Sequence, residues 1–244
     1  MNRMLAITKR ELISYFSTPV AYVFLVVFLV LSGVFTFYIG GLYERGQADL
    51  RPFFHALPWL FLFLIPALAM RLWAEERKSG TIELLMTLPI SVAESVIGKF
   101  AAAWLFSAIA IALTFPLWIT VNYLGDPDNA VIFGSYLGAL LMAGAYLAIG
   151  SCLSAVTKNQ VIAFIIAVVV CFLFIFSGFP MVLDLFQSWA PQFMVNAIAA
   201  LSFLTHFQNI VKGVLDLRDI IYFLSITIFW LYLNIVIVEM KKGD

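Results

Sequence analysis

Charged, turn-forming and apolar residues alternate in one short stretch between two apolar runs, from Glu75 to Ser91. A mixed charged run is followed by a Ser-Gly-Thr sequence that predicts the start of a short helix, which Pro89 ends. Apolar side chains share one face of this helix, and Glu83 lies on another. The stretch would then present a short helix to the cytoplasm, tied to the apolar runs on both sides. The residues that define it are Glu75, Glu76, Arg77, Gly80, Thr81, Ile82, Glu83, Leu85, Met86 and Pro89.

The alternative for this stretch is a solvated connector to which nothing binds. Its far end is better defined, because Ser91 and Glu94 have the spacing of a capping box. We therefore expect the next helix to begin about two turns before the membrane.

Residues that could perform covalent, metal or nucleotide chemistry are few. The two histidines, His55 and His206, lie in different loops and outside any metal-binding spacing, and no Ser/His/Asp set is visible. The pair Gly98-Lys99 precedes a phenylalanine, so it is not a phosphate-binding G-x-x-x-x-G-K-[ST] loop. Both cysteines lie inside apolar runs. We predict that the chain is not an enzyme and carries no cofactor or metal of its own.

Composition determines the class of protein. Of 244 residues, 64% are hydrophobic and 11% charged, and the mean hydropathy is +1.03. A soluble domain of this size could not bury so much apolar surface, so the sequence predicts an all-α, polytopic membrane protein. The net charge is +0, which makes nucleic acid an unfavourable partner.

Six segments are long and apolar enough to cross a bilayer. The predicted spans are 20–41, 57–73, 100–121, 131–155, 161–179 and 220–238. The first span is too long for the apolar region of a cleaved signal. A seventh crossing between Pro180 and Asp219 is the alternative, but prolines and polar residues interrupt it, so we predict re-entrant outer helices over 180–219. The cytoplasmic loop is predicted to be 74–99.

Orientation follows from the distribution of Lys and Arg. If both termini are cytoplasmic, the outer side carries only Arg45, Arg51, Lys212 and Arg218, and the other basic residues are inside. We therefore predict that both termini are cytoplasmic.

The first residues, 1–19, predict an amphipathic helix at the inner membrane interface. Lys9, Arg10 and Glu11 fall away from most of its apolar stripe. That stripe is expected to contain Met1, Met4, Leu5, Thr8, Leu12, Tyr15 and Phe16. On this segment alone, a simple surface anchor is the favoured interpretation.

The interiors of the predicted spans hold no Asp, Glu, Lys, Arg or His, which disfavours an ion-coupled carrier. Small residues at Gly134-x-x-x-Gly138 favour close helix packing within the chain over a dimer contact.

Several motifs resemble those of type 2 ABC exporter permeases. The inner loop, from Glu75 to Ser91 and then Gly98-Lys99, looks like that family's signature, and Lys9-Arg10-Glu11-Leu12 followed by Pro19 looks like its amino end. The stretch from His206 to Leu224 is similar to the gliding-motility-associated branch.

The resemblance implies a specific assembly. A second copy of the permease pairs with the first, and separate ABC ATPase subunits, which hold ATP and Mg, dock beneath. The amino-terminal helix, with Lys9, Arg10 and Glu11, resembles the connecting helix, and 180–219 resembles the re-entrant outer helices. Gly80–Leu88 resembles the coupling helix that docks on the ATPase. The resemblance thus implies docking roles for the residues named above between Glu75 and Pro89, whose charges would fix register and orientation more than affinity. Gliding-type relatives also work with a membrane protein that has a large outer domain. The implied location is the bacterial cytoplasmic (inner) membrane.

We therefore expect a transmembrane permease subunit of an ATP-driven exporter. Two alternatives stay open: an ATP-independent channel or carrier, and an anchor subunit that transmits ATP hydrolysis to an envelope partner.

Overall fold

A computed structural model describes residues 3–80, 90–187, 190–214 and 216–241. Within these residues all regular elements are helical, as the sequence predicts. The elements are α1 (Arg3–Ser17), α2 (Pro19–Gly33), the π-helical turn η1 (Val34–Ile39), α3 (Arg51–Ala69), α4 (Arg71–Ser79), α6 (Val92–Ala112), α7 (Phe115–Leu124), α8 (Asn129–Val156), α9 (Gln160–Phe176), α10 (Pro180–Gln187), α11 (Gln192–Ala199), α12 (Phe203–Val211) and α13 (Leu217–Met240).

Between five and seven helical segments are suited to crossing a membrane. Five are unbroken in length and composition: Pro19–Ile39, Arg51–Ser79, Val92–Leu124, Asn129–Val156 and Leu217–Met240. Two further pairs of helices are long and apolar enough only when each pair is taken together. The first pair, α9 and α10, is bent by 81°, and the second, α11 and α12, is bent by 63°. The chain is therefore a multi-pass membrane protein.

Prolines explain several helix boundaries. Pro19 occupies the first turn of α2, where its missing N–H costs nothing, and Pro116 does the same for α7. Pro58 and Pro66 lie inside α3 but do not end it, and the helix is interrupted only at Met70. The second predicted span, 57–73, is thus the middle of a longer helical segment.

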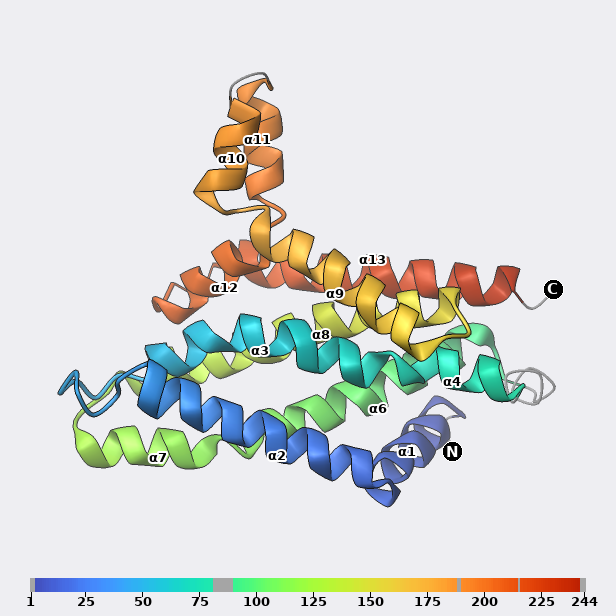
Figure 1. The fold of residues 1–244 in the computed structure, drawn as a ribbon, viewed down its shortest axis with the longest axis horizontal. Coiled ribbons are helices and arrows are strands. Elements are labelled where there is room, and N and C mark those ends of the chain that lie inside the picture. Colours follow the sequence, from blue (N-terminus) through green and yellow to red (C-terminus); the bar gives the residue numbers. More distant parts are fainter. Residues whose placement is uncertain (1–2, 81–89, 188–189, 215, 242–244) are drawn as a thin grey trace.

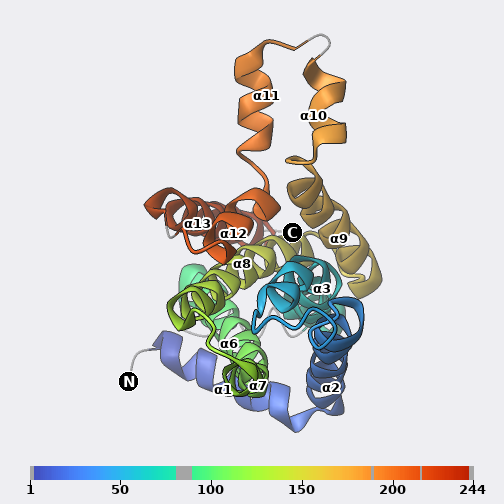
Figure 2. The same cartoon turned by 90° about the vertical axis from the view of Figure 1, so that its left-hand side faces the viewer.

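Helix α8 forms the centre of the bundle and is the most buried of the five unbroken spans. Helices α3, α6, α9, α12 and α13 pack around it (Figures 1 and 2). Its glycines make this packing close, since a Cβ built on Gly150 would lie 2.5 Å from the Cβ of Ala69, and one on Gly138 would lie 3.0 Å from Ile210. These small residues serve packing within the chain, as expected from the sequence.

Helices α10 and α11 project sideways from the bundle as an arm (Figures 1 and 2). At the base of the arm, Gly178 and Ser202 bring the two ends of the arm close together, because a Cβ on Gly178 would lie 2.5 Å from the Ser202 hydroxyl. Along the arm the side chains of Met181, Leu185 and Phe193 are exposed. The arm therefore presents an exposed apolar surface, and its two helices pack chiefly on each other.

Candidate functional site

The candidate site lies where α1 crosses the beginning of α6. A Cβ on Gly98 would lie 2.9 Å from the Cγ2 atom of Ile7, so only glycine permits this approach. One residue along α1, the Thr8 hydroxyl donates to the Gly98 carbonyl at 3.2 Å. Helix α1 is therefore packed against the bundle and is more than a surface anchor.

The face of α1 that packs against the bundle differs from the predicted apolar stripe. Leu5, a member of the stripe, is 54% exposed, whereas Ile7, which is outside the stripe, is 5% exposed. The reason is that Gly98 selects the buried face, because the gap it leaves in α6 admits Ile7.

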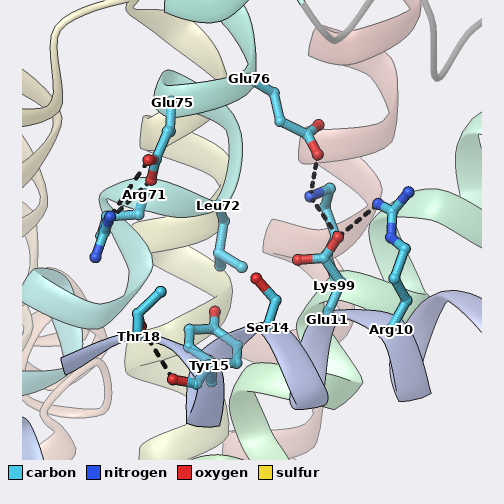
Figure 3. Close-up of a pocket in the computed structure, with 10 residues that line it drawn as sticks. All are labelled: Arg10, Glu11, Ser14, Tyr15, Thr18, Arg71, Leu72, Glu75, Glu76 and Lys99. Carbon is cyan, nitrogen blue, oxygen red and sulfur yellow. Dashed lines mark hydrogen bonds and ion pairs between the residues drawn. The ribbon is translucent and has the colours of Figure 1, made fainter. Parts of the chain in front are cut away.

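Lys99 joins three helices at this crossing. Its ammonium lies 3.2 Å from the carboxylate of Glu11 on α1 and 2.7 Å from the carboxylate of Glu76 on α4 (Figure 3). The Lys99 side chain is 2% exposed, and its ammonium also lies 5.4 Å from the centroid of the Trp73 ring. We call Glu11, Glu76 and Lys99 the charged junction.

The charges of the junction are mutually dependent. Burial acts to raise the pKa of Glu11, but Lys99 and Arg10 outweigh this effect, so the Glu11 pKa lies below its ordinary value. The Arg10 guanidinium donates to the Glu11 carboxylate at 2.7 Å. Removing one member of such a buried set leaves its partner uncompensated, which is costly.

A cavity of about 360 Å³ adjoins the junction (Figure 3). It is lined by Arg10, Glu11, Ser14, Tyr15, Thr18, Arg71, Leu72, Glu75, Glu76 and Lys99. Its three basic and three acidic side chains balance, and Arg71 pairs with Glu75 at 2.9 Å. The cavity therefore lies between α1 and α4 with a charge-balanced lining, which does not favour an anion.

Helix α4 is fixed to the central helix through Ser154. The Ser154 hydroxyl accepts from the backbone N–H groups of Trp73 and Ala74 at 3.1 and 3.0 Å and donates to the Met70 carbonyl at 2.8 Å. Arg77 adds a bond from its guanidinium to the Ala155 carbonyl at 2.8 Å. Arg77, which the sequence placed among docking residues, thus contacts α8.

The two ends of the predicted coupling segment are well defined. Gly80 has a φ of 74° and ends α4, and the short helix predicted to start at the Ser-Gly-Thr sequence lies outside the described residues. Ser91 and Glu94 form the predicted capping box at the start of α6, with the Glu94 N–H donating to the Ser91 hydroxyl at 3.1 Å and the Ser91 N–H donating to the Glu94 carboxylate at 2.9 Å. Thr81, Ile82, Glu83, Leu85, Met86 and Pro89 lie outside the described residues.

The structure brings together only some of the predicted site residues. Glu11 and Glu76 meet at Lys99, while Arg10 and Glu75 line the adjoining cavity. Lys9 is exposed and lies outside this group. Lys99 was not predicted as a site residue. A lysine directly before an apolar run could have indicated a buried ion pair.

His206, which lies outside any metal-binding spacing, forms two polar contacts that connect neighbouring segments. Its Nδ1 atom lies 2.5 Å from the Asp219 carboxylate, and its Nε2 atom lies 3.0 Å from the Ala200 carbonyl. The pair connects α12 to the start of α13, at the end of the bundle opposite the charged junction (Figure 1).

Comparison with known proteins identifies the family. The sequence model described as "ABC-2 family transporter protein" matches residues 5–239. No curated protein matches the chain significantly. Because the match extends over nearly the whole sequence, the chain belongs to the ABC-2 transporter family.

Proposed function

We propose that this chain is the transmembrane permease subunit of an ABC exporter, and that a separate ABC ATPase subunit drives it. Family membership implies a permease that works with an ATPase in a lipid bilayer. The observation that carries the rest is the charged junction, because Lys99 links α1, α4 and α6 through one buried ammonium. A displacement of α6 strains both ion pairs, and a displacement of α1 or α4 strains the pair that each makes with Lys99.

In this proposal the coupling helix is the segment that separates α4 from α6. Gly80, Thr81, Ile82, Glu83, Leu85, Met86 and Pro89 carry it. Because α4 is bonded to α8 at one end of the segment and α6 is capped at the other, a push on the segment is passed to the central helix. The two states of the ATPase would supply the differential binding energy, and rigid helices would carry the change outward.

Helix α1 serves as the connecting helix. Its exposed face presents Lys9 and Arg10 beside the junction, while Glu11 bonds Lys99. We propose that ATPase movement also reaches α1 and changes the Glu11–Lys99 distance. ATP and Mg belong to the ATPase in this scheme, and the chain itself holds neither.

We further propose six crossings with both termini in the cytoplasm of a bacterial inner membrane. Helix α1 and the end of α13 lie at the same end of the bundle, which favours an even number of crossings (Figure 1). The remaining crossing would be α9, within the predicted span 161–179, and 180–219, which contains α10, α11 and α12, would be the re-entrant outer segment. The excess of basic residues at the α1 end supports this orientation.

The proposed assembly contains a second copy of the permease. The resemblance of the inner loop and the amino end to type 2 permeases supports this, and the exposed apolar arm of α10 and α11 suits contact with lipid or with a second copy. The gliding-type branch, with its partner bearing a large outer domain, stays a proposal that rests on the motif around Gly213 to Leu224.

The experiment that tests the function is reconstitution with an ABC ATPase recovered from native membranes. We expect the wild-type permease to stimulate ATP hydrolysis. The double variant Gly80→Ala/Glu83→Ala should abolish this stimulation. The control Lys212→Gln, at the end of the bundle opposite the charged junction, should leave it unchanged. Full stimulation by the double variant would contradict the coupling role. Transport that follows an ion gradient with no ATPase recovered would favour a channel or carrier, and hydrolysis that acts only on an outer partner would favour an anchor subunit.

A further inference from the structure

A second cavity at the α1 end of the bundle differs in charge from the one beside the junction. It has a volume of about 380 Å³ and lies between the end of α4 and the start of α9. Its lining residues are Lys78, Thr157, Lys158, Asn159, Gln160 and Val161. Among the described residues, this lining contains two lysines and no carboxylate, so the cavity favours an anion.

The polypeptide around this cavity is held in a defined conformation. The Asn159 carboxamide oxygen accepts from the Val161 N–H at 2.9 Å, and the Asn159 N–H donates to the Thr157 hydroxyl at 3.1 Å. These polar groups are engaged within the loop. The ammonium groups of Lys78 and Lys158, both on exposed residues, remain the strongest ligands that the lining offers.

Further cations lie immediately behind the cavity. Arg77 donates to the carbonyl of Ala155 at 2.8 Å, and Lys241 donates to the carbonyl of Val156. These bonds use the last carbonyls of α8 and bring additional positive charge to the residues that precede Thr157.

An apolar stripe begins where the cavity ends. Val161, Ile165, Val169 and Leu173 follow one another at intervals of four residues along α9, and all are more than half exposed. The rise from the first to the last is about 18 Å, which is comparable to the ~15 Å hydrocarbon depth of one leaflet. A cationic cavity that continues into an apolar helix face matches an amphiphile with an anionic head.

We propose that this cavity binds the phosphate of an anionic phospholipid, with Lys78 and Lys158 as its ligands and the acyl chains along the α9 stripe. Basic pockets between membrane helices are suited to anionic headgroups. The inference goes beyond the proposed function and needs no ATPase. In the proposed orientation the lipid belongs to the cytoplasmic leaflet, and Lys78 places its headgroup two residues before the coupling segment.

The test is native mass spectrometry of the delipidated full chain in detergent with phosphatidylglycerol, phosphatidylcholine or inorganic phosphate. We expect a preference for phosphatidylglycerol over phosphatidylcholine. At about fivefold per lysine near the membrane surface, the double variant Lys78→Gln/Lys158→Gln should bind phosphatidylglycerol about thirtyfold more weakly. The charge-retaining Lys78→Arg/Lys158→Arg variant should bind it like the wild type.

The matched control removes two cations at the opposite end of the bundle, as Lys212→Gln/Arg218→Gln, and should keep the preference. Equal binding of both lipids by the wild type, or equal losses in the two Gln double variants, would overturn the proposal. Competition by inorganic phosphate as effective as that of phosphatidylglycerol would overturn the lipid assignment in favour of a free anion. Monodisperse elution of each variant establishes that it is folded. Because no ATPase is present, failure here leaves the exporter proposal intact.

Discussion

The ammonium of Lys99 lies 2.7 Å from the carboxylate of Glu76, although the two residues belong to different helices on either side of the proposed coupling segment. The same ammonium lies 3.2 Å from Glu11. One nearly fully buried cation thus holds together the three helices that an ATPase would have to move.

Replacement of Lys99 by methionine should destabilise the protein. The change leaves two partly buried carboxylates without their cation, and we expect a loss of about 2–3 kcal/mol, below the ~3–5 kcal/mol typical of a fully buried pair. Thermal unfolding of the purified chain in detergent measures the loss. Lys212→Met, which removes a cation at the other end, is the control, and an equal decrease in the two variants would argue against the junction.

The stability of the α1 contact should depend on acid pH through Glu11. Its pKa in the folded protein lies below the ordinary value of 4.5, so the carboxylate contributes stability that is present above pH 4.5 and is lost as pH falls through the lowered pKa. Glu11→Gln should remove this part of the pH dependence. Melting temperatures measured between pH 7 and pH 3.5 should therefore converge for the two proteins at low pH. If the melting temperatures of the wild type and Glu11→Gln differ by the same amount at every pH, ionisation of Glu11 does not contribute to stability.

Replacement of Gly98 by alanine should displace α1. The added Cβ would lie 2.9 Å from Ile7, and overpacking of this kind typically costs about 1–3 kcal/mol. Faster amide hydrogen exchange in α1 is the expected signature. Ile7→Ala in the same chain should restore part of the protection, whereas Gly33→Ala, where nothing lies within 4 Å, should have no effect on α1.

Ser154→Ala should loosen α4 from α8. The hydroxyl serves two backbone N–H groups and one carbonyl, and their loss should cost about 1–3 kcal/mol. Ser107→Ala is the matched control, because the Ser107 hydroxyl bonds only the Ala103 carbonyl of its own helix. If the two variants melt at the same temperature, the proposed attachment of α4 is wrong.

Local sequence signals predicted much of this fold. The capping box at Ser91, the proline at the start of α2 and the small residues of α8 each act within a few residues or on one helix face, so their consequences are visible in the sequence. The continuation of α3 into α4 also has a local signal, because Arg71 and Glu75 are spaced for an i,i+4 ion pair.

The candidate site depends on long-range contacts that no local pattern contains. Lys99 meets Glu11 from 88 residues away, and Thr8 meets Gly98 from 90 residues away. Leu5 and Ile7 are both suitable apolar residues, and only the opposite helix decides which is buried. The sequence therefore identified the helices, while the partners of Lys99 required the three-dimensional structure.

The central claim is that the segment between α4 and α6 docks on an ATPase, and site-specific photocrosslinking from position 85 in native membranes tests it most directly. We predict a crosslink to an ABC ATPase subunit, with none from the same probe at exposed Tyr123 near the opposite end of the bundle. A probe at position 85 that reacts only with lipid, water or its own chain would contradict the account.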